Sequence, residues 1–196
     1  MGRIKSALEL ALERTEQIQG DKSSLEQHDA RQQGKKLANE YLEGVISSPG
    51  ALETALKKNP ETMKAAVRQG LFEVFLARIS LPQDENDVKR IETLGKGLQI
   101  IIHDARLPSL WKQFQAMAAR YLDEAAQYED AIKRQFAPQL RQKEAELSQR
   151  LGQEVHIDPF QIPEFAAFYK KNMDALKSNY EAAIQDLREQ VSGFLS

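Results

Sequence analysis

Two stripes of apolar side chains, each repeating every three or four residues, constrain this chain more than any other feature. The first begins at Leu110 and recurs as far as Leu151, and the second runs from Phe165 to Phe194. Apolar residues at this spacing share one face of an α-helix. The pattern therefore predicts two helices far longer than the average of about 11–12 residues, each with a face that must be covered.

The segment between the two stripes indicates how these helices are connected. It contains Pro159 and Pro163, which bias the residues before them toward extended backbone. A turn near residues 153–163 predicts an antiparallel helical hairpin over residues 106–196. Pro138 lies inside the first stripe, where the loss of its backbone donor predicts a kink or a break.

The turn of this hairpin is apolar, although loops are normally polar. Two arrangements would cover its side chains: the turn folds onto its own hairpin, or it docks on another chain. A hairpin tip far from the main core has little apolar surface to cover it, so we expect docking. The candidate partner-binding residues are Ile157, Phe160, Ile162 and Phe165.

The N-terminal part of the chain predicts shorter helices. Residues 1–20 form an amphipathic pattern, and Gly20 is expected to stop that helix. Ser23 and Glu26 stand in capping-box spacing, which predicts that a second helix begins there.

Residues 21–105 are expected to form a compact helical domain. Ser48 and Asn59 each precede a proline and are expected to cap the helices that follow. Residues 60–80 are apolar around almost the whole helix axis, which predicts the central core helix. The expected fold class is therefore all-α: a small helical bundle domain followed by a long antiparallel helical hairpin.

The composition argues against several classes of protein. The formal net charge is -2 and there is no clustered run of Lys and Arg, so we expect no nucleic-acid partner. No apolar run approaches the roughly 20 residues of a membrane span, and the charged N-terminus does not read as a signal peptide. The chain has no cysteine, which fits a reducing compartment, and we expect a cytoplasmic protein.

The side chains that could perform chemistry form no specific catalytic set. His28, His103 and His156 lack the spacing of known metal motifs and are interpreted as surface or capping residues. Four carboxylates in "YLDEAAQYED" lie near basic residues and predict a salt-bridged, solvated face rather than a metal site; they are Asp123, Glu124, Glu129 and Asp130. We therefore expect no catalytic residues, no metal and no cofactor.

Three glycines lie inside predicted helices. Gly95 and Gly97 in "LGKGLQ" lack the spacing and the preceding strand of a phosphate-binding loop. Close packing of helices, or a local weakening of the helix, explains them better, and Gly70 has the same interpretation.

These observations favour a non-enzymatic protein–protein interaction module, such as a scaffold, an adaptor or a chaperone-like protein. Two helices alone would not cover the apolar stripes, so a protein partner or a homodimer joined by coiled-coil packing is expected. The alternative is a bundle that binds a small apolar ligand in a pocket lined by Phe72, Phe75, Trp111 and Phe114. A carboxylate–histidine metal-dependent enzyme is the weaker alternative.

Overall fold

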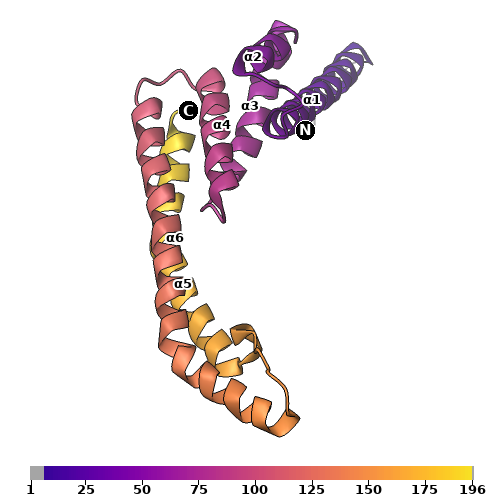
Figure 1. Cartoon of the computed structure of the whole chain (residues 1–196). Helices are drawn as coiled ribbons and strands as arrows, with labels where there is room; N and C mark the ends of the chain where they lie inside the picture. The colour runs from indigo at the N-terminus through magenta and orange to yellow at the C-terminus, as the bar shows by residue number, and fades with distance from the viewer. Residues whose placement is uncertain (1–6, 196) are drawn as a thin grey trace, which may run out of the picture. The chain divides into compact units, whose positions relative to one another are not determined.

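The computed structural model describes the backbone of residues 7–195 and the side chains of residues 23–195. In this part of the chain every regular element is helical, which confirms the all-α prediction (Figure 1). The elements in chain order are α1 (Ala7–Leu42), α2 (Pro49–Lys57), α3 (Glu61–Ala77), α4 (Glu85–Ile101), α5 (Leu107–Leu151), the 3-10 turn η1 (Pro159–Gln161) and α6 (Pro163–Gly193).

The helices form two compact units. The helical unit contains the residues up to Ile79 together with Glu92–Leu107. The hairpin unit contains Ser80–Ile91 and Pro108–Ser196. The predicted division into domains at residues 20 and 105 stays a prediction, because compact packing does not test independent folding.

Helix α1 is continuous through Gly20, so the predicted stop at this glycine is wrong, and so is the predicted helix start at Ser23. A glycine inside a helix costs only about 1 kcal/mol relative to alanine and does not by itself end it. The chain leaves the helical path at Gly44, where φ is 80° and a side chain would be strained. The amphipathic face predicted for residues 1–20 lies outside the described side chains.

Helices α1 and α3 cross at two glycines of the helical unit. A β-carbon on Gly34 would collide with the carbonyl oxygen of Val67, and one on Gly70 would collide with that of Arg31. The missing side chains allow the two backbones to touch, which confirms the packing interpretation of Gly70. Beside the crossing, Arg31 pairs with Glu73, and the Lys35 Nζ lies 3.1 Å from a Glu73 oxygen.

Helix α3 supplies much of the core of the helical unit, as predicted. Its residues Val67, Leu71 and Phe75 are fully buried. Tyr41 of α1 packs edge-on against Phe75 with ring centroids 6.1 Å apart. A β-carbon on Gly97 of α4 would lie 2.8 Å from the Phe75 ring, so this glycine also makes room for a neighbour.

The two proline-associated caps have different outcomes. Ser48 caps α2 as predicted, because its Oγ accepts a hydrogen bond from the backbone N–H of Ala51 at 3.2 Å. Asn59 does not cap α3. Its amide nitrogen instead donates to the carbonyl oxygens of Ala55 and Leu56, at 3.0 and 3.2 Å, and satisfies the C-terminal end of α2.

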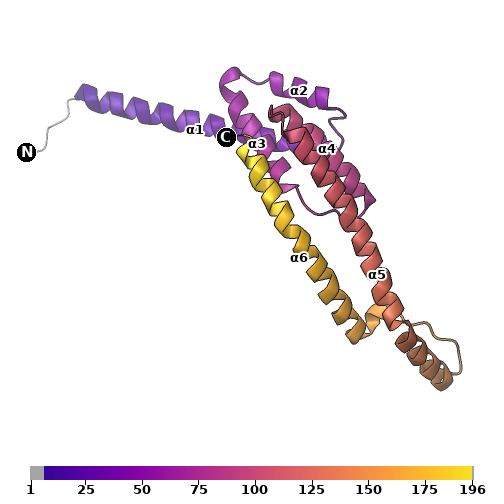
Figure 2. The same ribbon diagram turned by 90° about the vertical axis from the view of Figure 1, so that its left-hand side faces the viewer.

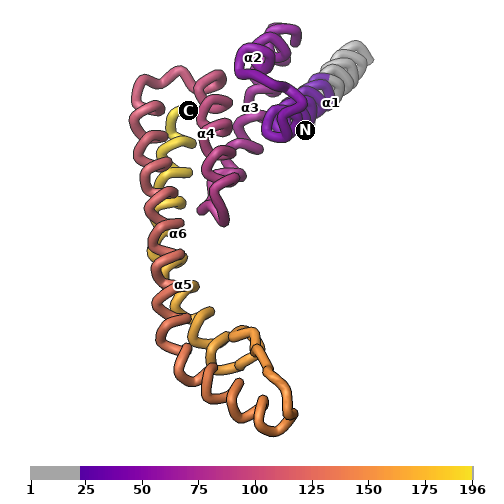
Figure 3. Tube along the Cα trace, in the orientation of Figure 1, coloured from indigo at the N-terminus to yellow at the C-terminus, as the bar shows by residue number. Residues whose placement is uncertain are grey.

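Helices α5 and α6 form the long antiparallel hairpin (Figures 1 and 2). Helix α5 continues through Pro138 without a break. Figure 3 shows that the trace of α5 curves along its length, and α6 follows it. A proline inside a helix removes one hydrogen bond and pushes against the preceding turn, which accounts for a bend without a break.

Candidate protein-binding surface of the hairpin unit

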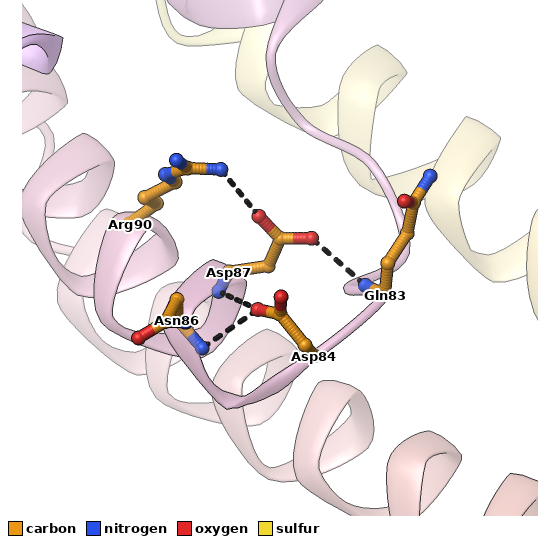
Figure 4. A network of polar contacts seen from close by, with 5 residues as sticks. All are labelled: Gln83, Asp84, Asn86, Asp87 and Arg90. Carbon is orange, nitrogen blue, oxygen red and sulfur yellow. Dashed lines mark hydrogen bonds and ion pairs between the residues drawn. The ribbon is translucent and has the colours of Figure 1, made fainter.

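A network of hydrogen bonds and one ion pair lies at the start of helix α4, in the hairpin unit (Figure 4). The Asp84 Oδ1 accepts hydrogen bonds from the backbone N–H groups of Asn86 and Asp87, at 2.8 and 3.0 Å. Asp87 accepts in return from the Gln83 N–H at 2.9 Å and pairs with Arg90 at 2.8 Å. This reciprocal cap satisfies two of the free amides at the helix start, those of Asn86 and Asp87.

The hydrogen bond from the Gln83 amide is the main reason that the pKa of Asp87 lies below its ordinary value, and the Arg90 guanidinium adds to the effect. The carboxylate is therefore charged near neutral pH. It stands at the positive end of the helix dipole, where negative charge is favoured.

Trp111 attaches the first two turns of α4 to α5. Its indole N–H donates to the carbonyl oxygen of Ile91 at 3.0 Å, and the ring is almost fully buried. Phe114, one turn further along, packs edge-on against it with centroids 5.1 Å apart. Residues 80–91 are thereby held against one end of the hairpin.

Two tyrosines of α6 connect it to the carboxylates of α5. The Tyr180 hydroxyl donates to Glu124 at 2.8 Å, and the Tyr169 hydroxyl donates to Glu129 at 3.2 Å. The Tyr180 ring also packs edge-on against Tyr121 of α5. These contacts favour one register of the two helices, since a shift by one turn would break both hydrogen bonds.

The same carboxylates pair with basic side chains on α5, as the sequence predicted. Arg120 lies 2.8 Å from Glu124, and Lys133 lies 2.5 Å from Glu129. These cations are the main reason that the pKa of each glutamate is lowered. The sequence pattern did not predict the glutamate partners of the two tyrosine hydroxyls, although a tyrosine at the edge of an apolar stripe places a hydroxyl where it needs a partner.

A groove opens in the hairpin unit beyond the start of α4. Its volume is about 1360 Å³, and three segments line it: residues 80–89, the α5 residues between 119 and 129, and the α6 residues between 169 and 188. The groove is open to solvent on one side, so it is suited to an elongated partner rather than an enclosed small molecule.

The floor and the rim of this groove differ in chemistry. Half-buried apolar side chains form the floor, among them Leu122, Ala125 and Met173. The rim has five carboxylates and three cations; they are Asp84, Glu85, Asp123, Glu129 and Glu181 against Lys89, Lys177 and Arg188. The groove therefore offers an apolar strip with an excess of negative charge along its edges.

The four predicted partner-binding residues lie together at the hairpin tip, but in different environments. Phe165 is fully buried and Ile162 is 8% exposed, and both belong to a small core with Ile132. Ile157 packs against that core, whereas Phe160 is 48% exposed. Two of the four residues are therefore covered by the chain itself, and docking at the tip stays a prediction that rests on Phe160.

The turn is fastened to its own hairpin by polar contacts as well. The Glu144 carboxylate accepts a hydrogen bond from the Ile157 N–H, and the Ser148 hydroxyl accepts one from the Val155 N–H, both at 3.0 Å. Phe160 then covers Phe165, with ring centroids 5.2 Å apart. The aromatic residues of the tip thus form a local core that stabilises the fold-back arrangement.

The side chains proposed for a small-ligand pocket do not line this groove. Phe72 and Phe75 are buried in the helical unit, and Trp111 and Phe114 are buried in the hairpin unit. Phe75 contacts Tyr41, and Trp111 contacts Phe114, so their rings fill core space.

The three histidines have different surroundings in the described part of the chain. His28 is exposed, the His103 Nδ1 lies 3.1 Å from an Arg68 nitrogen, and His156 lies near Glu144 and Glu154. Among the described residues, no three His, Cys, Asp or Glu side chains gather closely enough to hold a metal ion. Within the same residues, no helix is both long and apolar enough to cross a membrane.

Comparison with known proteins adds a family and no function. A family model described as "Family of unknown function (DUF6657)" matches residues 53–193. That match includes α3 to α6 and therefore the whole groove. No curated protein and no solved structure matches the chain.

Proposed function

This chain belongs to the family of unknown function DUF6657, and we propose that it is a non-enzymatic protein-binding module that holds its partner in the groove of the hairpin unit. The observation that supports this proposal is the groove itself, with an apolar floor between two long helices and a charged rim. A scaffold, an adaptor or a chaperone-like protein would use such a surface.

Several contacts within the hairpin unit hold the shape of the groove. The capped start of α4 closes one end, and the Trp111–Ile91 hydrogen bond holds that end to α5. The tyrosine–glutamate pairs keep α5 and α6 in register. A surface that is already formed loses little conformational entropy when a partner binds, which increases affinity.

Photo-crosslinking at two neighbouring positions of α5 tests this function. Ala126 is exposed and lines the groove, whereas Gln127 is exposed and does not. A photo-reactive phenylalanine analogue replaces each residue in turn, and the full chain is irradiated in the cells that produce it. We expect a discrete crosslinked protein from position 126 and a much weaker product, or none, from position 127.

Crosslinked products are identified by mass spectrometry. Equal products from both positions, or no protein product from position 126, would argue against the groove as the binding surface. A crosslink to a second copy of this chain would identify the homodimer form of the proposal. A small apolar molecule that stays bound in native mass spectrometry would favour the ligand-binding alternative instead.

A further inference from the structure

We propose that the groove binds one amphipathic α-helix of another protein, with its apolar side chains on the floor and its Lys or Arg side chains at the rim. This inference rests on the proposed protein-binding function and specifies the class of partner. The length, the floor and the charge of the groove support it in turn.

The walls of the groove favour a helix over an extended peptide. Two walls are the helices α5 and α6, whose backbone hydrogen bonds are made internally, and the third is the loop of residues 80–84 with the capped start of α4. The third wall contains no β-strand. An extended peptide would find no strand edge to pair with, and its buried N–H and C=O groups would be unsatisfied. A helix satisfies its own backbone and presents only side chains.

The position of the groove also fits a helix. Residues 80–91 lie against the hairpin at one end, and the lining on α6 continues from there to Tyr169. At about 1.5 Å per residue, the stretch of α6 between Tyr169 and Arg188 is about 28 Å long. A helix of about 18 residues would match this length and would complete a three-helix arrangement beside α5 and α6.

The floor is suited to the apolar stripe of such a helix. Ala125 lies half-buried on the α5 side, and the exposed Ala119 and Ala126 line the groove beside it; small side chains let a neighbouring helix approach closely. Met173 lies on the α6 side, and its flexible side chain adapts to different apolar partners. Leu-like side chains at helical spacing would fill this floor.

The rim selects for positive charge. Among the described residues, Glu85 and Asp123 make no ion pair, although both line the groove. Glu129 pairs with Lys133, and Glu181 lies 3.6 Å from Lys177, so these two carboxylates are already balanced. The remaining charges of the lining are three carboxylates, Asp84, Glu85 and Asp123, against the two cations Lys89 and Arg188. Lysine or arginine side chains that flank an apolar stripe would pair with the remaining carboxylates, and acidic flanks would be repelled.

The test measures, by fluorescence anisotropy, how tightly designed peptides bind to the full chain. Three fluorescein-labelled 18-residue peptides are compared, with the length following from the groove at about 1.5 Å per residue. The first has a leucine stripe flanked by lysines, the second has the same stripe flanked by glutamates, and the third scrambles the first so that no stripe forms. We expect the lysine-flanked peptide to bind at least about 10-fold more tightly than either of the others, with an affinity that falls as salt rises.

Two matched arginine variants locate the binding site. Ala126→Arg places a bulky cation in the groove, and Gln127→Arg adds the same charge on the next exposed position of α5, outside the groove. We expect A126R to weaken binding of the lysine-flanked peptide at least about 10-fold and Q127R to change it less than about 2-fold. Circular dichroism and the emission of Trp111 check that both variants are folded.

Binding of the glutamate-flanked or the scrambled peptide as tightly as the lysine-flanked one would overturn the inference, and so would equal effects of the two arginine variants. If position 126 crosslinks to a protein but the lysine-flanked peptide does not bind, the basic-helix inference fails while the protein-binding function stands. If position 126 gives no crosslinked protein and the lysine-flanked peptide does not bind, the protein-binding function and the basic-helix inference both fail. A crosslink to this chain alone would replace the outside partner with a second copy.

Discussion

Gly34 and Gly70 face each other where α1 crosses α3, and a β-carbon on Gly34 would lie 3.1 Å from the Gly70 Cα. The atoms nearest to each absent side chain are backbone atoms of the other helix. A backbone cannot move aside as a flexible side chain does, so both positions require glycine as long as the helices remain in contact.

Replacement of Gly70 by alanine should therefore destabilise the helical unit. We expect Gly70→Ala to lower the free energy of unfolding by about 3 kcal/mol, at the upper end of the usual cost of overpacking, because α1 and α3 must separate. The measurement is urea denaturation followed by circular dichroism. Gly50→Ala is the control, since nothing lies within 4 Å of the added β-carbon, and it should leave stability unchanged or slightly higher.

The hydrogen bond between Tyr169 and Glu129 predicts a smaller effect in the hairpin unit. Tyr169→Phe retains the ring but leaves the Glu129 oxygen with one donor fewer, and we expect a loss of about 0.5–1.5 kcal/mol. Tyr128→Phe removes a hydroxyl from a residue that is 47% exposed and should have almost no effect. Urea unfolding followed by the emission of Trp111, the single tryptophan, compares the two variants; equal losses would show that the bond between the helices does not stabilise the register.

Phe165 is a core residue of the hairpin tip, whereas Phe160 lies partly at its surface. Phe165→Ala should cost about 3–5 kcal/mol because it leaves a cavity in the tip core. Phe160→Ala should cost only about 1–2 kcal/mol, since the side chain is 48% exposed. Thermal unfolding measures both changes, and a cost for Phe160 as large as that for Phe165 would contradict its half-exposed position.

A partner that binds the tip would be detected with the same Phe160→Ala variant. If the tip is also a docking surface, a partner should be crosslinked to the unmodified chain and should no longer be crosslinked to the folded Phe160→Ala variant. Retention of every partner by Phe160→Ala would argue against the predicted docking of the apolar turn.

The lowered pKa of Asp87 predicts a pH dependence for the start of α4. The charged form is favoured in the folded chain, so its contribution is present above the ordinary aspartate pKa and is lost as the pH falls through the lower, folded value. Asp87→Asn should therefore reduce stability at pH 7 and pH 5 by a similar amount, below about 1 kcal/mol because the site is partly solvated. Below about pH 4 the difference from the unmodified chain should shrink.

Asp174→Asn provides the control for this pH series, since Asp174 is an exposed residue of α6. Its stability difference should stay close to zero from pH 7 to pH 3. Chemical denaturation at each pH provides both comparisons. A constant difference for Asp87→Asn down to pH 3 would show that its charge does not support the cap.

Several features of the fold could be predicted because their causes are local. The long stripes of α5 and α6 follow from the helical period, and the caps at Ser48 and Asp84 follow from short side chains that reach the nearest free amides. The ion pairs of Glu124 and Glu129 follow from spacing on one helix face. Each of these depends only on the spacing of residues within one helix or at its start.

Other features required the tertiary structure because two local outcomes had similar free energies. Gly20 was predicted to end a helix, yet the helix continues, and the chain turns at Gly44 instead. Asn59 was predicted to cap the following helix, yet its side chain points back to the end of α2. Local spacing does not separate such alternatives, which differ by about 1 kcal/mol.

The sequence by itself determined that this protein consists of helices, where the two helices of the hairpin lie, and which of their faces are apolar. Only the tertiary structure decided what covers those faces. It buries Ile162 and Phe165 against the hairpin's own residues, and it leaves open the groove between α5, α6 and the start of α4. The physical reason is that periodicity shows which side must be removed from water, whereas the neighbour that removes it depends on contacts between distant segments of the chain.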